Sequence, residues 1–343
     1  MEKKEKNLPR KRRQFVDYGC ISPIDPLTLS PEDKRQALRS FMFLKEKRDG
    51  EVKSRAVVDG SDQRSYINKE DASSPTPNTD SIFITAAIDA YERRHVGQFD
   101  IPGAFLHTDT DEDVTMVLEG PLAEIMAKID LKLYCKHITK NGKGKPLLYV
   151  KCHKALYGLL RSALLFYRRL VGELEDIGFE LNPYDPCVAN KVVNGTQMTV
   201  VWHVDDVKAS HADDFEITKL AAHLQKIFGG LKVRRGNVLD YLGMELNYSE
   251  EGSVYIGQIE YLLNILREFP EHLRGPSPTP AADHLFDVRS EDDPAKRYLP
   301  EDQARIFHHV VAQLLFMACR ARRDVQTAVA CVKQPDEDDW MKL

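Results

Sequence analysis

The most regular hydrophobic pattern in the chain is a helical stripe near its middle. Apolar residues recur there every three or four positions, and a glycine follows where the C-terminus of a helix favours one. The spacing predicts a helix with one face in the core, formed by Ala163, Tyr167, Leu170, Leu174 and Ile177 and ended by Gly178. Weaker patterns of the same kind predict helices after the loop at 73–80, over 258–269 and around 306–321.

Extended segments lie between these helices. Asp49-Gly50 separates two extended stretches within 41–58, and this dipeptide is a strong hairpin signal because a type I′ turn needs positive φ. Further strands are expected before Phe99-Asp100, on both sides of an acidic turn within 198–211, and over 240–257. The remaining punctuation predicts a turn at NGKGKP (141–146) and a linker at RGPSPTP (274–280).

Length and composition narrow the class of protein. A chain of 343 residues is too long for one ordinary core, so two or three domain-sized units are expected. Its 42% hydrophobic content argues against global disorder. No run reaches the roughly 18 apolar residues that span a bilayer, and the N-terminus lacks the apolar stretch of a signal peptide. We therefore expect a cytoplasmic or nuclear protein that is not secreted, with its six cysteines reduced.

Charge is unevenly distributed. The net charge of −5 argues against nucleic-acid binding by bulk charge, so any such surface must be local. Residues 1–13 carry seven basic and two acidic side chains and fit either a solvated flexible arm or a phosphate-binding or nuclear-targeting segment. The predicted hairpin is also basic, and its cations could bind phosphates or keep an exposed ribbon soluble: Lys45, Lys47, Arg48, Lys53 and Arg55.

Three carboxylates stand where a structural role is awkward. Asp100 ends a predicted strand just before Pro102-Gly103, and Asp205-Asp206 interrupts two apolar runs. Adjacent aspartates also suit an ordinary turn, because Asp forms local hydrogen bonds there. Like charges placed so closely are tolerated mainly when a divalent cation neutralises them. Mg²⁺ is the natural candidate, and a pair of ions about 3.5–4 Å apart would favour phosphoryl or nucleotidyl transfer.

Another acidic segment lies nearby. Asp109, Asp111 and Asp113 are expected to form a loop, but Val114 and Gly120 stand where a calcium-binding EF-hand needs Gly and Glu. This spacing excludes an EF-hand.

A series of ordered motifs resembles the reverse transcriptases of Ty1/copia-type retrotransposon Pol polyproteins. The motifs lie within residues 35–332 and are FDIPGAFLHTDTDEDVTMVLEG, KCHKALYGLLRSALLFY, LNPYDPCVANK, VVWHVDDVKASH, DYLGMEL, IGQIEYLLNILREF and HHVVAQLLFMACRARRDVQTAV. The resemblance implies an α+β right-hand polymerase fold with fingers, an antiparallel palm sheet and a thumb, followed by the start of a connection segment. The implied divisions are a basic arm (1–25), fingers (26–95), palm (96–125), a fingers insertion (126–155), palm with the HVDD box (156–249), thumb and linker (250–290) and a truncated connection segment (291–343).

The same resemblance implies RNA-directed DNA polymerase activity with two Mg²⁺ ions, for which Mn²⁺ could substitute. Asp100, Asp205 and Asp206 would be catalytic and would bind metal together with the backbone carbonyl of Ile101. The implied partners are a primed RNA or DNA template and dNTPs, with other Pol or Gag-derived chains as further candidates, and the implied location includes a cytoplasmic virus-like particle. The implied nucleotide-binding residues are Arg55, Lys47, Phe105, Gly158 and Arg161, and the primer grip would be Leu242, Gly243 and Met244.

Several positions depart from the family pattern or have ordinary alternatives. Arg161 stands where the family has a nucleotide-pocket Gln, and His203 replaces the Tyr of the acidic box. Phe105 also suits core packing, and Leu242-Gly243-Met244 also suits a core strand. The chain is expected to be a polymerase fragment, since the ribonuclease H domain of the family does not follow. A catalytically silent nucleic-acid-binding remnant and a two-metal nuclease remain open as alternatives to a working polymerase.

Overall fold

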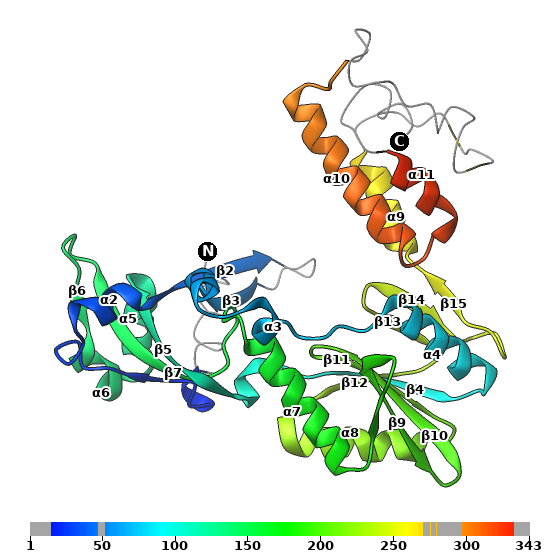
Figure 1. Cartoon of the computed structure of the whole chain (residues 1–343), viewed down its shortest axis with the longest axis horizontal. Coiled ribbons are helices and arrows are strands. Elements are labelled where there is room, and N and C mark those ends of the chain that lie inside the picture. The colour runs from blue at the N-terminus through cyan, green and yellow to red at the C-terminus, as the bar shows by residue number, and fades with distance from the viewer. Residues whose placement is uncertain (1–14, 47–51, 270–274, 276–278, 280–296, 333–343) are drawn as a thin grey trace.

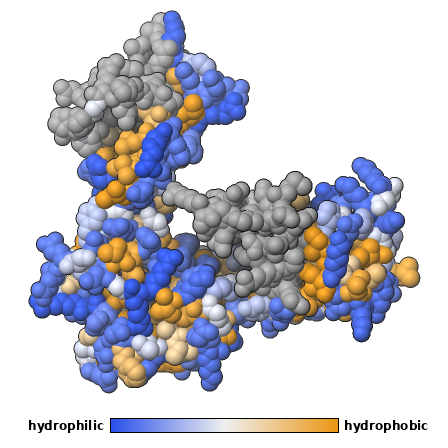
Figure 2. Space-filling view, turned by 180° about the vertical axis from the view of Figure 1, so that it is seen from behind, coloured by the Kyte–Doolittle hydropathy of each residue, from blue (hydrophilic) through white to orange (hydrophobic). Residues whose placement is uncertain are grey.

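The structure is a computed structural model that describes residues 15–46, 52–269, 275, 279 and 297–332. The described residues form two β-sheet units and a helical unit that stands above the second sheet (Figure 1). The space-filling view from behind shows the molecule hollowed between the helical unit and the first sheet (Figure 2). None of the helices in these ranges is both long and apolar enough to cross a membrane.

The first sheet contains the predicted basic hairpin. Its strands run in the order β1 (Ile21–Pro23), β7 (Pro146–Lys154), β5 (Asp109–Glu119), β2 (Leu38–Glu46) and β3 (Val52–Val58), and β6 (Thr139–Lys140) pairs with β7. β2 and β3 are antiparallel, as the sequence predicts, while the turn at Asp49-Gly50 lies outside the described residues. The short elements around this sheet are α2 (Pro31–Gln36), α5 (Pro121–Ile129), α6 (Leu131–Tyr134), η1 (Ser61–Ser65), α3 (Lys69–Ala72) and η3 (Cys135–His137).

The acidic segment from Asp109 to Asp113 is a strand, so the expectation of a loop is wrong. It forms the first half of β5 and contains a register shift against β7. The sheet supplies cations for these acids: Lys154 Nζ lies 2.7 Å from an Asp109 oxygen and Lys151 Nζ 3.1 Å from an Asp113 oxygen. Cross-strand pairing of this kind offsets the low strand propensity of aspartate.

The second sheet is a six-stranded antiparallel layer. Its order is β12 (Lys232–Arg235), β4 (His95–Asp100), β11 (Asp206–His211), β10 (Thr196–His203), β9 (Asp185–Val193) and β8 (Glu180–Asn182). Helices α7 (Ser162–Asp176) and α8 (Asp214–Phe228) cover one face (Figure 1). Leu170 and Leu174 of the predicted stripe are fully buried there, and Gly178 takes φ +87° just after α7. The predicted helix and its C-terminal glycine are confirmed.

The opposite face of this sheet carries α4 (Thr79–Tyr91) and a small sheet of β13 (Val238–Tyr241), β14 (Met244–Asn247) and β15 (Tyr255–Gly257) (Figure 1). Ile82, Val201, Met244 and Leu246 pack together between them. A buried ion pair between Lys208 of β11 and Asp89 of α4 also joins the two layers. Side chains two residues apart in a strand point to the same face. Asp206, two residues before Lys208, therefore faces the α4 side of the sheet.

The helical unit consists of α9 (Ile259–Glu268), α10 (Glu301–Ala318), η5 (Arg323–Val325) and α11 (Gln326–Cys331). Both helices that the sequence predicts here are confirmed. The predicted apolar side of α9 is nevertheless largely open to solvent: Ile259, Leu263 and Leu266 are exposed, and Ile265 is the buried residue of this helix.

Candidate active site

The strand register brings two of the three candidate carboxylates together. β4 and β11 are antiparallel, and Asp100 is the direct cross-strand partner of Asp206. Their neighbours Phe99 and Val207 point to the opposite face and are fully buried in the core. Asp205 lies in the turn that leads into β11, and its backbone carbonyl accepts a 3.1 Å hydrogen bond from the backbone N–H of Ile101. The two separate acidic motifs of the sequence therefore meet at one edge of the α4 side of the sheet.

The turn that presents Asp205 is strained. It connects β10 and β11 through Val204 and Asp205, and Val204 takes φ +55°. A β-branched residue rarely adopts this conformation, and such backbone costs about 1–3 kcal/mol. Strained backbone is concentrated at functional sites. Here the strained turn places Asp205 beside the β4–β11 strand pair.

Burial and like charge act together on Asp206. Its pKa is raised above the ordinary value, first by burial and then by the charges of Asp205 and Asp100, while His203 and Arg234 act in the opposite direction. His203 is the cross-strand partner of Asp206. The site therefore has an excess of negative charge that a bound cation would relieve.

Lys232 is a part of this site that the sequence analysis missed. β12 pairs with β4, and Lys232 stands opposite Asp100, with its Nζ 2.6 Å from Asp100 Oδ2. No sequence motif marks it, because the contact depends on the pairing of strands more than 130 residues apart. One oxygen of the central carboxylate is thus engaged by an ammonium group.

The donor chemistry fits a hard divalent cation. Carboxylate oxygens on paired strands, with a raised pKa at Asp206, are the groups that Mg²⁺ prefers. Within the described part of the chain, no three His, Cys, Asp or Glu side chains are already arranged as a metal-binding cluster. Ile101, expected to contribute its carbonyl, follows β4 and is fully buried. A metal ion bound through Asp100 Oδ2 would compete with Lys232 for that oxygen.

Phe105 lies close to the carboxylates in sequence and is partly buried. It belongs to the short helix η2 (Ala104–His107), which follows Gly103 at φ +69°. Its ring centroid lies 4.6 Å from that of Tyr157 and 6.4 Å from that of Phe166. The ring therefore packs against the core, and the sugar-contact role stays a prediction.

Gly158 lies between β7 and α7 and makes a close backbone approach to the end of β3 in the first sheet. It takes φ +99°, and a Cβ built on it would lie 1.9 Å from the carbonyl oxygen of Val58 at the end of β3. The preceding residue, Tyr157, accepts a 2.7 Å hydrogen bond from the Val58 N–H. Only glycine allows both the positive φ and the close approach of the Val58 carbonyl. The fold therefore requires glycine here, at a position that is also expected to contact the nucleotide.

Arg161 is committed to the acidic strand β5. Its guanidinium lies 2.8 Å from an Asp111 oxygen and 3.7 Å from a Glu112 oxygen. Gln63, which is fully buried, donates to Glu112 Oε2 at 2.7 Å and accepts from the Leu160 N–H at 3.0 Å. Burial raises the pKa of Glu112, with Arg161 acting in the opposite direction. This polar network connects η1, β5 and the start of α7.

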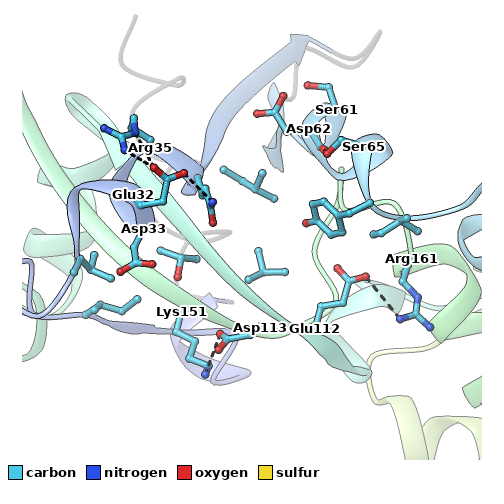
Figure 3. Close-up of a pocket in the computed structure, with 18 of the residues that line it drawn as sticks. Glu32, Asp33, Arg35, Ser61, Asp62, Ser65, Glu112, Asp113, Lys151 and Arg161 are labelled. Carbon is cyan, nitrogen blue, oxygen red and sulfur yellow. Dashed lines mark hydrogen bonds and ion pairs between the residues drawn. The ribbon is translucent and has the colours of Figure 1, made fainter.

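The network lines one side of a large pocket of about 1590 Å³. Figure 3 shows Arg161 and Glu112 at that side, the Lys151–Asp113 pair along β5 and β7, and Glu32 with Arg35 at the far side. At the position expected to hold a Gln, Arg161 therefore carries a positive charge that Asp111 and Glu112 neutralise.

The expected primer-grip residues form a tight hairpin turn. Leu242 and Gly243 connect β13 to β14 with φ values of +51° and +77°, the pattern of a type I′ turn. Met244 is buried, and the Tyr241 hydroxyl donates to the Val201 carbonyl at 3.2 Å. The hairpin is thus anchored on the same sheet face as the carboxylates.

The two remaining candidates belong to the basic segment that the sequence predicts as a hairpin. Arg55 belongs to β3 and pairs in register with Phe43 of β2, whose side chain is exposed. Lys47 lies outside the described residues. Both roles stay predictions.

Comparison with known proteins decides the family. Residues 26–280 match the model of the family described as "Reverse transcriptase (RNA-dependent DNA polymerase)". The chain belongs to this family. It is 26% identical over 322 residues to the retrovirus-related Pol polyprotein from transposon TNT 1-94 of Nicotiana tabacum, a match that covers 90% of this chain and 23% of that protein. It is 24% identical over 247 residues to the transposon Ty1-NL2 Gag-Pol polyprotein of Saccharomyces cerevisiae, covering 70% of this chain and 13% of that protein.

This reverse transcriptase domain is accordingly of the Ty1/copia type and spans about a quarter or less of the curated relatives it matches. The described residues have an α+β fold built on largely antiparallel sheets, and the assignment of the second sheet as the palm of a right-hand polymerase fold stays a prediction. Among solved structures it is similar to telomerase of Candida tropicalis in complex with a TWJ fragment of telomeric RNA (TM-score 0.42, 11% identity, 93% of this chain and 55% of that chain). Telomerase of Candida albicans is also similar (TM-score 0.39, 12% identity, 72% and 49%).

Proposed function

We propose that this reverse transcriptase domain catalyses RNA-directed DNA polymerisation by nucleotidyl transfer from a dNTP to a primer 3′-hydroxyl. The observation that supports it is the pairing of Asp100 with Asp206, with Asp205 in the adjoining strained turn. The reaction forms a bond between the primer 3′-oxygen and the α-phosphorus, and it breaks the bond from that phosphorus to pyrophosphate. The partners under this proposal are a primed RNA or DNA template and dNTPs.

The carboxylates would do their work as ligands. Asp100 and Asp205 would hold two Mg²⁺ ions, with Asp206 and the Ile101 carbonyl completing the set. When bound, the ions supply charge neutralisation at the attacking and leaving oxygens. The protein contributes a preorganised geometry, since the strand pair and the turn hold the acids in place before substrate arrives.

The surrounding residues would orient the substrates. Phe105 would contact the nucleotide sugar with the open side of its ring, and Arg55 would contact the triphosphate, because a guanidinium can form two hydrogen bonds with a phosphate. The Leu242–Gly243 turn would hold the primer end. Arg161 would act indirectly, by holding β5 against the start of α7 through Asp111 and Glu112.

Primer extension on an RNA template, with Mg²⁺ and separately with Mn²⁺, tests the proposal. The double variant Asp205→Asn, Asp206→Asn should lose deoxynucleotide addition while still binding the primer–template. Asp176→Asn is a matched control, because it makes the same chemical change at an exposed carboxylate at the end of α7. Folded wild-type protein that binds primer–template without extending it would refute the proposal and favour a silent nucleic-acid-binding remnant. Strand cleavage without extension would favour a nuclease.

A further inference from the structure

We propose that Gln258 and Phe316 are positioning residues that couple the helical unit α9–α11 to the Leu242–Gly243 turn. This inference rests on the proposed function, in which that turn holds the primer end. It goes further by assigning a role to α10, which begins at Glu301, beyond the end of the family match at residue 280.

The turn needs support from outside its own hairpin. Leu242 takes φ +51°, a conformation that costs a non-glycine residue free energy and persists only where the surroundings hold it. Leu242 packs beside the buried residues of β13 and β14, which holds its side chain. The neighbouring Gly243 has no side chain of its own to pack, and its backbone is contacted by residues of the helical unit.

Gln258 holds the Gly243 carbonyl. It stands immediately before α9, is 7% exposed, and its Nε2 donates to the Gly243 oxygen at 2.7 Å. Its other amide atom, Oε1, is buried without a hydrogen-bond partner among the described residues. Burying an amide with an unsatisfied acceptor costs free energy. The hydrogen bond to Gly243 offsets part of this cost.

Phe316 covers the same glycine from α10. A Cβ built on Gly243 would lie 3.6 Å from Phe316 Cζ, so the ring sits directly against the turn. The ring is held on two sides: its centroid lies 5.2 Å from that of Tyr261 on α9, and the Arg320 guanidinium carbon lies 3.8 Å from it. The Phe316 ring therefore links α10 both to α9 and to the turn at Gly243.

A second anchor ties the helical unit to the palm. The Arg323 guanidinium lies 3.0 Å from an Asp80 oxygen of α4 and 5.1 Å from the centre of the Phe83 ring. Because α4 also packs on the palm sheet, this contact and the Phe316 contact fasten the end of α10 at two points. The helical unit can then fix the position of the Leu242–Gly243 turn relative to the palm sheet.

The test is a comparison of steady-state extension kinetics in three variants. Phe316→Ala and Gln258→Glu should raise the KM for primer–template about tenfold, as expected for loss of one buried contact or hydrogen bond. The KM for dNTP and the response to Mg²⁺ should stay unchanged. Gln258→Glu keeps the side-chain shape, removes the donor to Gly243 and places a negative charge beside the Gly243 carbonyl. Leu315→Ala is the matched control, since Leu315 precedes Phe316 on α10 and is 46% exposed.

Fluorescence anisotropy with a labelled primer–template and no dNTP gives a readout that does not depend on chemistry. The dissociation constant should rise about tenfold for the two test variants and stay constant for Leu315→Ala. Equal binding by all four proteins, or a loss confined to kcat, would overturn the inference. If wild-type protein neither binds nor extends primer–template, the proposed function itself fails. Should Phe316→Ala not fold, Gln258→Glu alone decides the outcome.

Discussion

Replacing Lys232 with glutamine is expected to strengthen the binding of a divalent cation to the protein without nucleotide. In the structure the Lys232 ammonium lies 2.6 Å from Asp100 Oδ2, on the carboxylate that the proposed function assigns to both metal ions. A metal ion at that oxygen would compete with this ammonium and be repelled by its charge. Glutamine removes the charge and keeps most of the side-chain length.

The expected magnitude follows from the exposure of the pair. The Lys232 side chain is 70% exposed and that of Asp100 37%, so solvent screens their attraction strongly. Exposed pairs contribute about 0.2–1 kcal/mol. Since a tenfold change in affinity corresponds to about 1.4 kcal/mol, the gain in metal affinity should not exceed about fivefold.

The assay is titration of the metal-free protein with Mn²⁺, followed by electron paramagnetic resonance of the free ion. Arg234→Gln is the matched control, because it removes the same charge from the same face of β12, where it acts on Asp206. Lys232→Gln should bind Mn²⁺ more tightly than Arg234→Gln. Equal affinities for the two variants, or weaker binding by Lys232→Gln, would refute the idea that the ammonium competes for Asp100.

Two further predictions concern stability and can be checked by urea unfolding. Lys208→Met should lower the free energy of unfolding by about 3–5 kcal/mol, because it leaves the fully buried Asp89 carboxylate without its partner. Adding Asp89→Leu should recover most of this loss. A Lys208→Met protein within about 1 kcal/mol of wild type, roughly the contribution of an exposed pair, would contradict this reasoning. Gly158→Ala should cost about 2 kcal/mol or more, because φ +99° is strained for alanine and its Cβ would meet the Val58 carbonyl. Gly172→Ala, in α7 with open space around it, should instead stabilise by about 0.5–1 kcal/mol, and equal midpoints for the two glycine variants would count against the close-approach argument.

Elements with a local signal could be read directly from the chain. The α7 stripe and its terminal Gly178 are recognisable because helical periodicity and the left-handed C-terminal residue depend on neighbours in sequence. The β2–β3 strands and the β10–β11 pair around the acidic turn are predictable for the same reason. The ordered motifs also placed the chain in its family and marked Asp100, Asp205 and Asp206 as candidates.

Features that depend on distant partners could not be read in this way. The run from Asp109 to Asp113 looks like a loop because its stabilising cations, Lys151 and Lys154 among them, come from another strand. The α9 stripe predicts a helix correctly, but its period does not say which side is covered. The ion pair between Arg161 and Asp111 likewise depends on the sheet, since no local motif indicates it.

In the candidate active site, too, some features follow from the local sequence and others only from tertiary structure. Residue types and local spacing identify the acids and the turn that carries two of them. The register of β4 with β11 and β12 decides that Asp100 faces Asp206 and Lys232, and the packing of α10 decides that Phe316 covers Gly243. These contacts join segments far apart in the chain, and their free energy depends on burial and charge that exist only after the sheets and helices have assembled.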